Sequence, residues 1–162
     1  MKNLVVGFSG KLGSLLIQRD GFVPLNCDIT DINTIEEPAY NILGEEWDFG
    51  VVVNLAAISS VDECEEDYEK ALKVNRTGLI NLHKVLGDRV LNISSDQVFS
   101  GKSLFLPNEK TAPAPINAYG FSKLGAEAAS QAFGGKTLRL SRTVSLNDPD
   151  IDMYLTNLLE GE

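Results

Sequence analysis

Tyr119 and Lys123 lie four residues apart in the stretch AYGFSKLGAE and are of types that can transfer a proton together. On an α-helix this spacing puts both side chains on one face, about one turn apart. A phenol beside an ammonium suits proton transfer, because the positive charge favours the phenolate and lowers the tyrosine pKa. Tyr and Lys at this spacing also occur by chance on many exposed helices, so the interpretation depends on what precedes the pair in the chain.

A glycine-rich turn lies near the N-terminus. The aliphatic run from Lys2 to Val6 predicts a buried strand, and the segment GFSGKLG follows it and leads into a helical pattern. A strand, such a turn and a helix start form a pyrophosphate site, because glycines let the backbone approach the ligand and free helix amides face its charge. The spacing G-x-x-G-x-x-G has one residue more in its first gap than the usual dinucleotide fingerprint. The candidate cofactor-binding residues of the turn are Gly7, Phe8, Ser9, Gly10, Lys11, Leu12 and Gly13.

A second short strand is predicted over residues 22–27, and Asp28 and Ile29 follow it. Asp28 comes about 20 residues after Gly7, where a carboxylate reaches the adenosine ribose in dinucleotide-binding folds. The stretch from Asp28 to Asp31 also has the pattern of a helix start whose carboxylates cap backbone amides, and both interpretations stay open. No arginine closely follows Asp28 to receive a 2′-phosphate, which favours NAD over NADP.

Predicted strands and helices alternate through the rest of the chain. Further strands are expected over 48–55, 90–93 and 136–140, and helices over 32–46, 62–86, 118–133 and 151–159. This alternation predicts a single α/β domain with a doubly wound parallel sheet. Residues 101–117 form a long loop with three prolines, and loops of this length are often functional lids.

Two strand ends carry further candidate residues. The strand over 48–55 leads into Leu55, Ala56 and Ala57, which are small or apolar residues against whose backbone a cofactor could lie. The strand over 90–93 leads into Ser94 and Ser95, and the carboxyl ends of parallel strands are where doubly wound sheets bind ligands. Asn75 falls inside the predicted helix over 62–86, where an asparagine is a poor helix former unless its amide has a partner or faces water.

Length and charge exclude several classes of function. The 162 residues are enough for one domain with one sizeable core. The net charge of −9 argues against nucleic acid and anionic membrane surfaces as partners. Cys27, Cys64 and His83 show neither metal-ligand nor disulfide spacing, so we expect no metal site and a reduced compartment. Without a leader segment or an apolar stretch near ~18 residues, the chain is expected to be cytoplasmic.

Five segments, taken in order, resemble the extended short-chain dehydrogenase/reductase family, which has a Rossmann fold. They are VNLAAISSVDECE, ALKVN, NISSDQVFSGK, AYGFSKLGAE and LRLSRTVS. The most similar branch is that of the dTDP-4-dehydrorhamnose reductases and related nucleotide-sugar reductases and epimerases. The resemblance implies a dinucleotide-binding domain over 1–145, followed by a short extension over 146–162 where relatives build a substrate domain.

The resemblance also implies a role for each candidate catalytic residue. Tyr119 would be the general acid/base toward a substrate carbonyl or hydroxyl, and Lys123 would lower its pKa and hold the nicotinamide ribose. Ser95 would hydrogen-bond the reacting oxygen, and Ser94 would reach the cofactor. Asn75 would support a proton-relay water. NAD or NADP is then the expected cofactor, and hydride passes between its nicotinamide and a nucleotide-linked sugar.

Three functions stay open. The chain is a reductase or epimerase whose site is closed by the 101–117 loop or by an oligomer partner. Alternatively, it is a non-catalytic dinucleotide-binding or regulatory subunit, since the region that would bind the sugar is missing. In the third case it is a remnant of a longer enzyme retained for assembly. The family further implies a homodimer that packs through the 62–86 helix and the Tyr119 helix.

Overall fold

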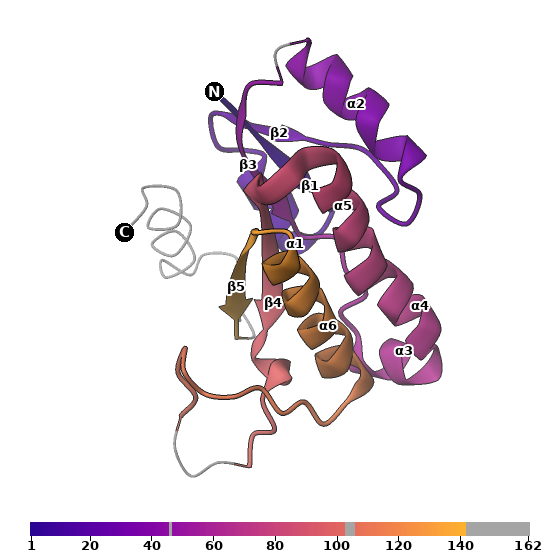
Figure 1. Cartoon of the computed structure of the whole chain (residues 1–162), viewed down its shortest axis with the longest axis vertical. Coiled ribbons are helices and arrows are strands. Elements are labelled where there is room, and N and C mark those ends of the chain that lie inside the picture. The colour runs from indigo at the N-terminus through magenta and orange to yellow at the C-terminus, as the bar shows by residue number, and fades with distance from the viewer. Residues whose placement is uncertain (46, 103–105, 142–162) are drawn as a thin grey trace.

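Five parallel strands form one sheet in the order β2-β1-β3-β4-β5 (Figure 1). The computed structural model describes residues 1–45, 47–102 and 106–141. The strands are β1 (Lys2–Val6), β2 (Phe22–Pro24), β3 (Phe49–Asn54), β4 (Val90–Ser95) and β5 (Lys136–Leu140). Because the chain moves outward from β1 to β2 and then crosses back to β3, the sheet is doubly wound. The predicted Rossmann-like α/β fold is confirmed.

Helices connect the strands (Figure 1). They are α1 (Lys11–Leu16), α2 (Asn33–Leu43), α3 (Val61–Glu66), α4 (Tyr68–Leu72), α5 (Gly78–Leu86) and α6 (Ala118–Ala132). A π-helical turn, η1 (Lys73–Thr77), joins α4 to α5, and short 3₁₀ turns are η2 (Gly87–Arg89) and η3 (Asp96–Val98). The predicted helix over 151–159 lies outside the described residues.

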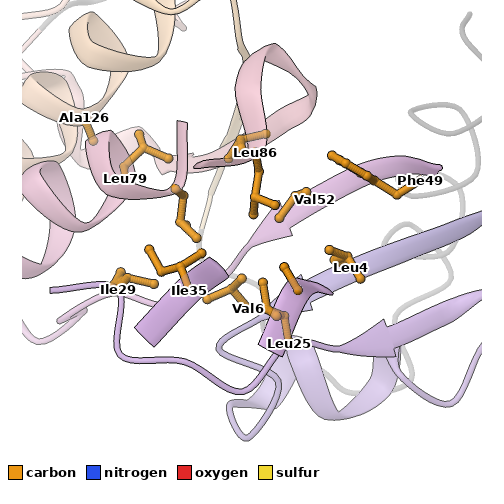
Figure 2. Packing of buried hydrophobic residues seen from close by; sticks show 13 residues of the cluster. Leu4, Val6, Leu25, Ile29, Ile35, Phe49, Val52, Leu79, Leu86 and Ala126 are labelled. Carbon is orange, nitrogen blue, oxygen red and sulfur yellow. The ribbon is translucent and has the colours of Figure 1, made fainter. Parts of the chain in front are cut away.

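Two apolar clusters cover the two faces of the sheet, because successive strand residues point to opposite sides. The larger cluster packs Leu4 and Val52 against Ile35 of α2, Leu79 of α5 and Ala126 of α6 (Figure 2). The smaller cluster packs the alternate strand positions against α1 and includes Val5, Leu16, Phe22, Val53 and Leu91. Most of the helical mass therefore lies on one face, and α6 is fixed there by burial of its apolar side.

Three predicted elements have different bounds in the structure. Strand β2 ends at Pro24, three residues earlier than predicted, and the Leu25 N–H after it still donates to the Val5 carbonyl at 2.9 Å. The predicted 62–86 helix is interrupted at Asp67, which leaves the helical region (φ −139°, ψ 80°) and accepts a hydrogen bond from the Lys70 N–H to begin α4. The predicted helix over 32–46 is α2 (Asn33–Leu43), which contains Pro38 and packs on the core through the buried Ile35 and Ala39.

The described helices are short. The longest, α6, has 15 residues, whereas a membrane-spanning helix needs about 20 largely apolar ones. Among residues 1–45, 47–102 and 106–141, no helix has the length and apolarity to cross a membrane. In the same ranges, no three His, Cys, Asp or Glu side chains are grouped to hold a metal ion.

Candidate active site

Helix α6 holds Tyr119 and Lys123 one turn apart, as their spacing predicts. The helix begins after Asn117, whose side chain accepts a hydrogen bond from the Gly120 N–H at 2.7 Å and so caps a free amide. The Asn117 amide also donates to Gln97 Oε1 at 2.9 Å. A side chain at Gly120 would overlap the Gln97 carbonyl, so only glycine lets α6 approach the end of β4 this closely.

This close packing brings Tyr119 to Ser95. The interaction of the Tyr119 phenol with the Ser95 side chain pulls the pKa of the phenol downward. Burial of the phenol has the larger effect and raises the pKa, and the negative charges of Cys64 and Asp96 raise it further. The Tyr119 pKa therefore lies above its usual value. The expected lowering of this pKa by Lys123 is therefore not found: the net direction is upward, because loss of hydration penalises the phenolate.

Lys123 is buried, with 5% of its surface exposed. Burial lowers the pKa of its ammonium to about 8, because the charged form loses its hydration. The Glu127 carboxylate and the Cys64 thiol act in the opposite direction and favour the charged form. A lysine shifted this far, beside a tyrosine at a sheet edge, has the features of a functional-site residue.

The two serines at the end of β4 have different partners. Ser95 Oγ donates to Asp96 Oδ1 at 3.1 Å and accepts from the Gln97 N–H at 3.2 Å. Ser94 Oγ donates to Glu127 Oε1 at 2.6 Å, and the Glu127 carboxylate in turn binds Arg139 of β5. Ser95 thus faces the tyrosine, whereas Ser94, which the resemblance directs toward the cofactor, is bound to α6.

Asn75 lies in η1 and is 2% exposed. Its Oδ1 accepts from the Ile58 N–H at 2.8 Å, and its Nδ2 donates to the Ile58 carbonyl at 3.0 Å and to Ser122 Oγ at 2.8 Å. Ser122 Oγ donates to the Tyr119 carbonyl at 2.7 Å. Both amide protons of Asn75 are therefore used, and the proton-relay water implied by the resemblance would have to bind Oδ1 or the backbone carbonyl.

The glycine turn packs directly on the end of β3. Gly7 has φ +76°, and a side chain there would overlap the backbone of Leu55 and Ala56. A side chain at Gly13 would overlap the Gly7 carbonyl and the Phe8 backbone. The turn and the residues after β3 were predicted as two separate candidate sites. In the structure they form one continuous surface. On it, Ser9, Gly10 and Lys11 are exposed, and Phe8, Leu12, Leu55, Ala56 and Ala57 are partly buried.

Gly10 differs from its two neighbours in the motif. Its φ of −75° is open to any residue, and a Cβ there would meet only the Gly7 carbonyl, at an ordinary 3.4 Å. The fold therefore does not explain why this position lacks a side chain. A bare backbone beside the exposed turn is what a closely approaching pyrophosphate requires, so the residues present fit a dinucleotide.

Asp28 is exposed, and its carboxylate has local partners. Oδ1 accepts from the Thr30 N–H at 2.9 Å and from Thr30 Oγ1 at 2.8 Å, and these hydrogen bonds lower the Asp28 pKa. The carboxylates of the predicted helix start do bind backbone amides, since Asp31 Oδ1 accepts from the Asn33 N–H at 3.0 Å, but α2 begins only at Asn33 and Asp28 caps the turn before it. The ribose contact of Asp28 stays a prediction. Ile29 is a core residue with 4% exposure whose carbonyl accepts from Asn81, so its side chain is not presented to a ligand and its cofactor contact stays a prediction.

Three side chains around the pair were not predicted. Ser122 and Glu127 lie within the AYGFSKLGAE segment, and Cys64 lies near the pair on α3. The i, i+4 spacing of Lys123 and Glu127 is a signal that the sequence does contain. Cys64 had no such signal, because only the packing of α3 against α6 brings its thiol into the field of Lys123.

A doubly wound parallel sheet with a glycine turn, and a Tyr-x-x-x-Lys pair beside a serine, define an α/β protein of the Rossmann-like class. The model of the family called RmlD substrate binding domain matches residues 1–159. The chain belongs to this family.

Curated relatives and solved structures agree. The chain is 35% identical over 150 residues to the dTDP-4-dehydrorhamnose reductase of Burkholderia thailandensis, covering 88% of this chain and 50% of the relative. It is 40% identical over 105 residues to the probable low-salt glycan biosynthesis reductase Agl14 of Haloferax volcanii, covering 63% and 33%. It also resembles the crystal structure of dTDP-4-dehydrorhamnose reductase from Bacillus anthracis in complex with NADP, with a TM-score of 0.72 and 27% identity over 87% of this chain and 53% of that one. The chain spans a third to a half of the length of these curated relatives.

Proposed function

We propose that this chain is the dinucleotide-binding and proton-transferring part of an NAD(P)-dependent reductase or epimerase that acts on a nucleotide-linked sugar. The observation that carries the proposal is the meeting of Tyr119, Ser95 and the buried Lys123 at the carboxyl edge of the sheet. A purely structural domain has no need to bury an ammonium beside a tyrosine, because the burial costs stability.

The cofactor would bind over the glycine turn. Gly7, Gly10 and Gly13 would lie against its pyrophosphate, and Ala56 and Ala57 would flank it beyond β3. Lys123 would hold the nicotinamide ribose. When bound, the dinucleotide supplies the hydride, and the chain's own residues bind, orient and protonate. NAD is preferred over NADP in this proposal, since no arginine closely follows Asp28, although the Bacillus anthracis relative was solved with NADP.

Tyr119 would act as the general acid in the reductive direction. Its raised pKa keeps the proton on the phenol oxygen near neutral pH, where it can be given to a substrate oxygen. Ser95, whose side chain interacts with the same phenol, would orient that substrate oxygen toward it. In the oxidative direction, the ammonium of Lys123 would stabilise the phenolate electrostatically.

A nucleotide-linked sugar is the proposed substrate because the relatives are named as sugar reductases. The described residues leave its recognition to the 101–117 loop, to a further part of a longer protein, or to a second subunit. We propose that a homodimer forms through the helical segment over 62–86, which comprises α3 to α5, and through α6, as the family resemblance implies. The cytoplasmic location stays a prediction, based on the free thiols Cys27 and Cys64.

A second candidate function is a dinucleotide-binding subunit without turnover of its own. Both functions require nucleotide binding, so they differ only in whether hydride is transferred to a sugar.

The test is a titration with NADH and NADPH, followed by nicotinamide fluorescence, of the wild type, Gly10→Asp and Tyr119→Phe. We expect saturable binding that Gly10→Asp abolishes and Tyr119→Phe retains. Oxidation of the bound nucleotide by a dTDP-linked 4-keto sugar, absent in Tyr119→Phe, then supports the reductase. Binding without oxidation supports the subunit function, and no binding of either nucleotide at millimolar concentration refutes both.

A further inference from the structure

The Glu127 carboxylate is fixed by three charge-assisted or short hydrogen bonds. Ser94 Oγ donates to Oε1 at 2.6 Å, and Arg139 donates from Nε to Oε1 at 2.8 Å and from Nη2 to Oε2 at 2.6 Å. The Arg139 guanidinium also stacks over the Phe99 ring, 5.0 Å from its centroid. Only 11% of the Glu127 side chain is exposed. Such a two-pronged Arg–carboxylate pair holds its members in one geometry.

Glu127 lies one helical turn after Lys123 and two turns after Tyr119 on α6. Residues at i and i+4 are neighbours on a helix surface, so the fixed carboxylate is next to the buried lysine. The interaction runs in the favourable sense, because the carboxylate raises the pKa of Lys123 against the effect of burial. Arg139 binds the same carboxylate at 2.6 Å, and a positive charge at this distance offsets part of the field of the carboxylate.

We propose that Glu127 is a positioning residue for the active site, which keeps Lys123 charged, and that Arg139 and Ser94 hold its carboxylate and limit its effect. This inference rests on the proposed function, because only a catalytic or cofactor-binding lysine needs a regulated charge. The proposed network thus includes residues of two strands, Ser94 of β4 and Arg139 of β5. The pairing of these strands therefore influences the charge of Lys123 on α6.

The other titratable groups around Lys123 are few in the part of the chain that the structure describes. Cys64 of α3 acts on Lys123, and Lys123 in turn favours the thiolate of Cys64. Asp96 of η3 acts on Tyr119. Arg76 of η1 packs near Gly125, on the α6 turn between Lys123 and Glu127. None of these groups binds the Glu127 carboxylate, so changes at Glu127 and Arg139 test the proposed relation directly.

The network predicts two shifts of opposite sign. Glu127→Gln removes the negative charge next to Lys123 and lowers its pKa. Arg139→Met removes the charge that offsets Glu127 and raises the pKa of Lys123. If the ion pair had only a structural role, both variants would loosen the same contact. The pKa of Lys123 would then shift in the same direction in both.

The experiment follows the Cε resonance of Lys123 by NMR in protein labelled with ¹³C-lysine, as the pH is raised from 6 to 10. Lys123→Arg assigns the resonance, and Glu37→Gln makes the same chemical change at an exposed carboxylate on α2 as a control. We expect the midpoint to fall by about one pH unit in Glu127→Gln, to rise in Arg139→Met and to stay unchanged in Glu37→Gln. Unchanged midpoints in both variants, or shifts of the same sign, overturn the inference.

The titration needs no nucleotide, so its result is independent of the proposed function. If NADH and NADPH fail to bind but the midpoints move in opposite directions, the proposed function is refuted and the electrostatic relation stands. If nucleotide binds and the midpoints do not move, the electrostatic relation is refuted and the proposed function stands. Where Arg139→Met lowers the melting temperature too far, Arg139→Gln replaces it, because the glutamine amide keeps one hydrogen bond to the carboxylate without the charge.

Discussion

Asn75 Nδ2 lies 2.8 Å from Ser122 Oγ, and this hydrogen bond joins residues 47 positions apart. Through it, the loop after β3 is connected to the helix that holds Tyr119 and Lys123. The Asn75 side-chain amide binds both the N–H and the carbonyl of Ile58, as the backbone of a neighbouring strand would. The loop after β3 and helix α6 are thereby connected by a single buried amide.

Replacement of Asn75 by alanine should therefore destabilise the fold. Three hydrogen bonds are lost, and the partly buried Ile58 N–H loses its acceptor. The Ile58 carbonyl keeps the Cys64 thiol, and Ser122 Oγ keeps the Tyr119 carbonyl. We expect a loss of about 2–3 kcal/mol in the free energy of unfolding, measured by urea denaturation. Asn26→Ala, at an exposed position, is the control and should change stability by less than about 0.5 kcal/mol. An Asn75→Ala variant as stable as the control would contradict the structural role.

Two glycine substitutions separate folding from binding in the turn. Gly10→Asp should fold like the wild type, because position 10 is the N-cap of α1, where aspartate is favoured. Its carboxylate would repel a pyrophosphate, and we expect affinity for NADH or NADPH to fall by at least about tenfold. Gly7→Ala should instead lower the melting temperature, because of its φ of +76° and the overlap with Ala56. Retained nucleotide affinity in Gly10→Asp would exclude the turn as the pyrophosphate site.

The lowered pKa of Lys123 predicts that the free energy of unfolding rises at alkaline pH. Its pKa falls from 10.5 in the unfolded chain to about 8 in the folded protein, so between these values the unfolded state binds more protons. The penalty for burying the charge is present in full below pH 8 and disappears as the pH rises through this window. The stability gained by Lys123→Met over the wild type should thus shrink by about 2–3 kcal/mol between pH 7 and pH 10. Urea denaturation at several pH values measures it, and a constant difference would contradict the burial of a charged Lys123.

His83 predicts a loss of stability at acidic pH. Its ring stacks on Phe133 at 5.3 Å, and Nδ1 and Nε2 have the Gly87 carbonyl and Ser130 Oγ as partners. Burial lowers the pKa of His83, so the unfolded chain takes up its proton first as the pH falls below 6.5. Stability should fall there by at most about 1.4 kcal/mol per pH unit. His83→Gln should remove this part of the slope, and calorimetry between pH 7 and pH 5 compares the two proteins. An identical slope in both would show that His83 titrates as in the unfolded chain.

Local patterns determined most of the fold and the position of the Tyr119–Lys123 pair on one helix. The glycine turn after a short aliphatic run, the strand–helix alternation and the Tyr119–Lys123 spacing are properties of neighbouring residues, so the sequence alone contains them. Periodicity did not reveal the break at Asp67 or the π-helical turn around Asn75. The break coincides with the Asp67 side chain, which caps α4, and the π-helical turn holds Asn75, whose side-chain amide binds the distant loop residue Ile58.

The charges at the site were decided by the tertiary structure. In the sequence, Lys123 is a cation that should lower the Tyr119 pKa. In the folded chain, burial raises the Tyr119 pKa and lowers that of Lys123, since hydration depends on what packs around a group and not on its neighbours in the chain. Likewise, Arg139 meets Glu127 only because β5 pairs with β4 beneath α6. Residue spacing thus placed the reactive groups on one helix, and the packing of distant strands and loops against that helix determined their protonation.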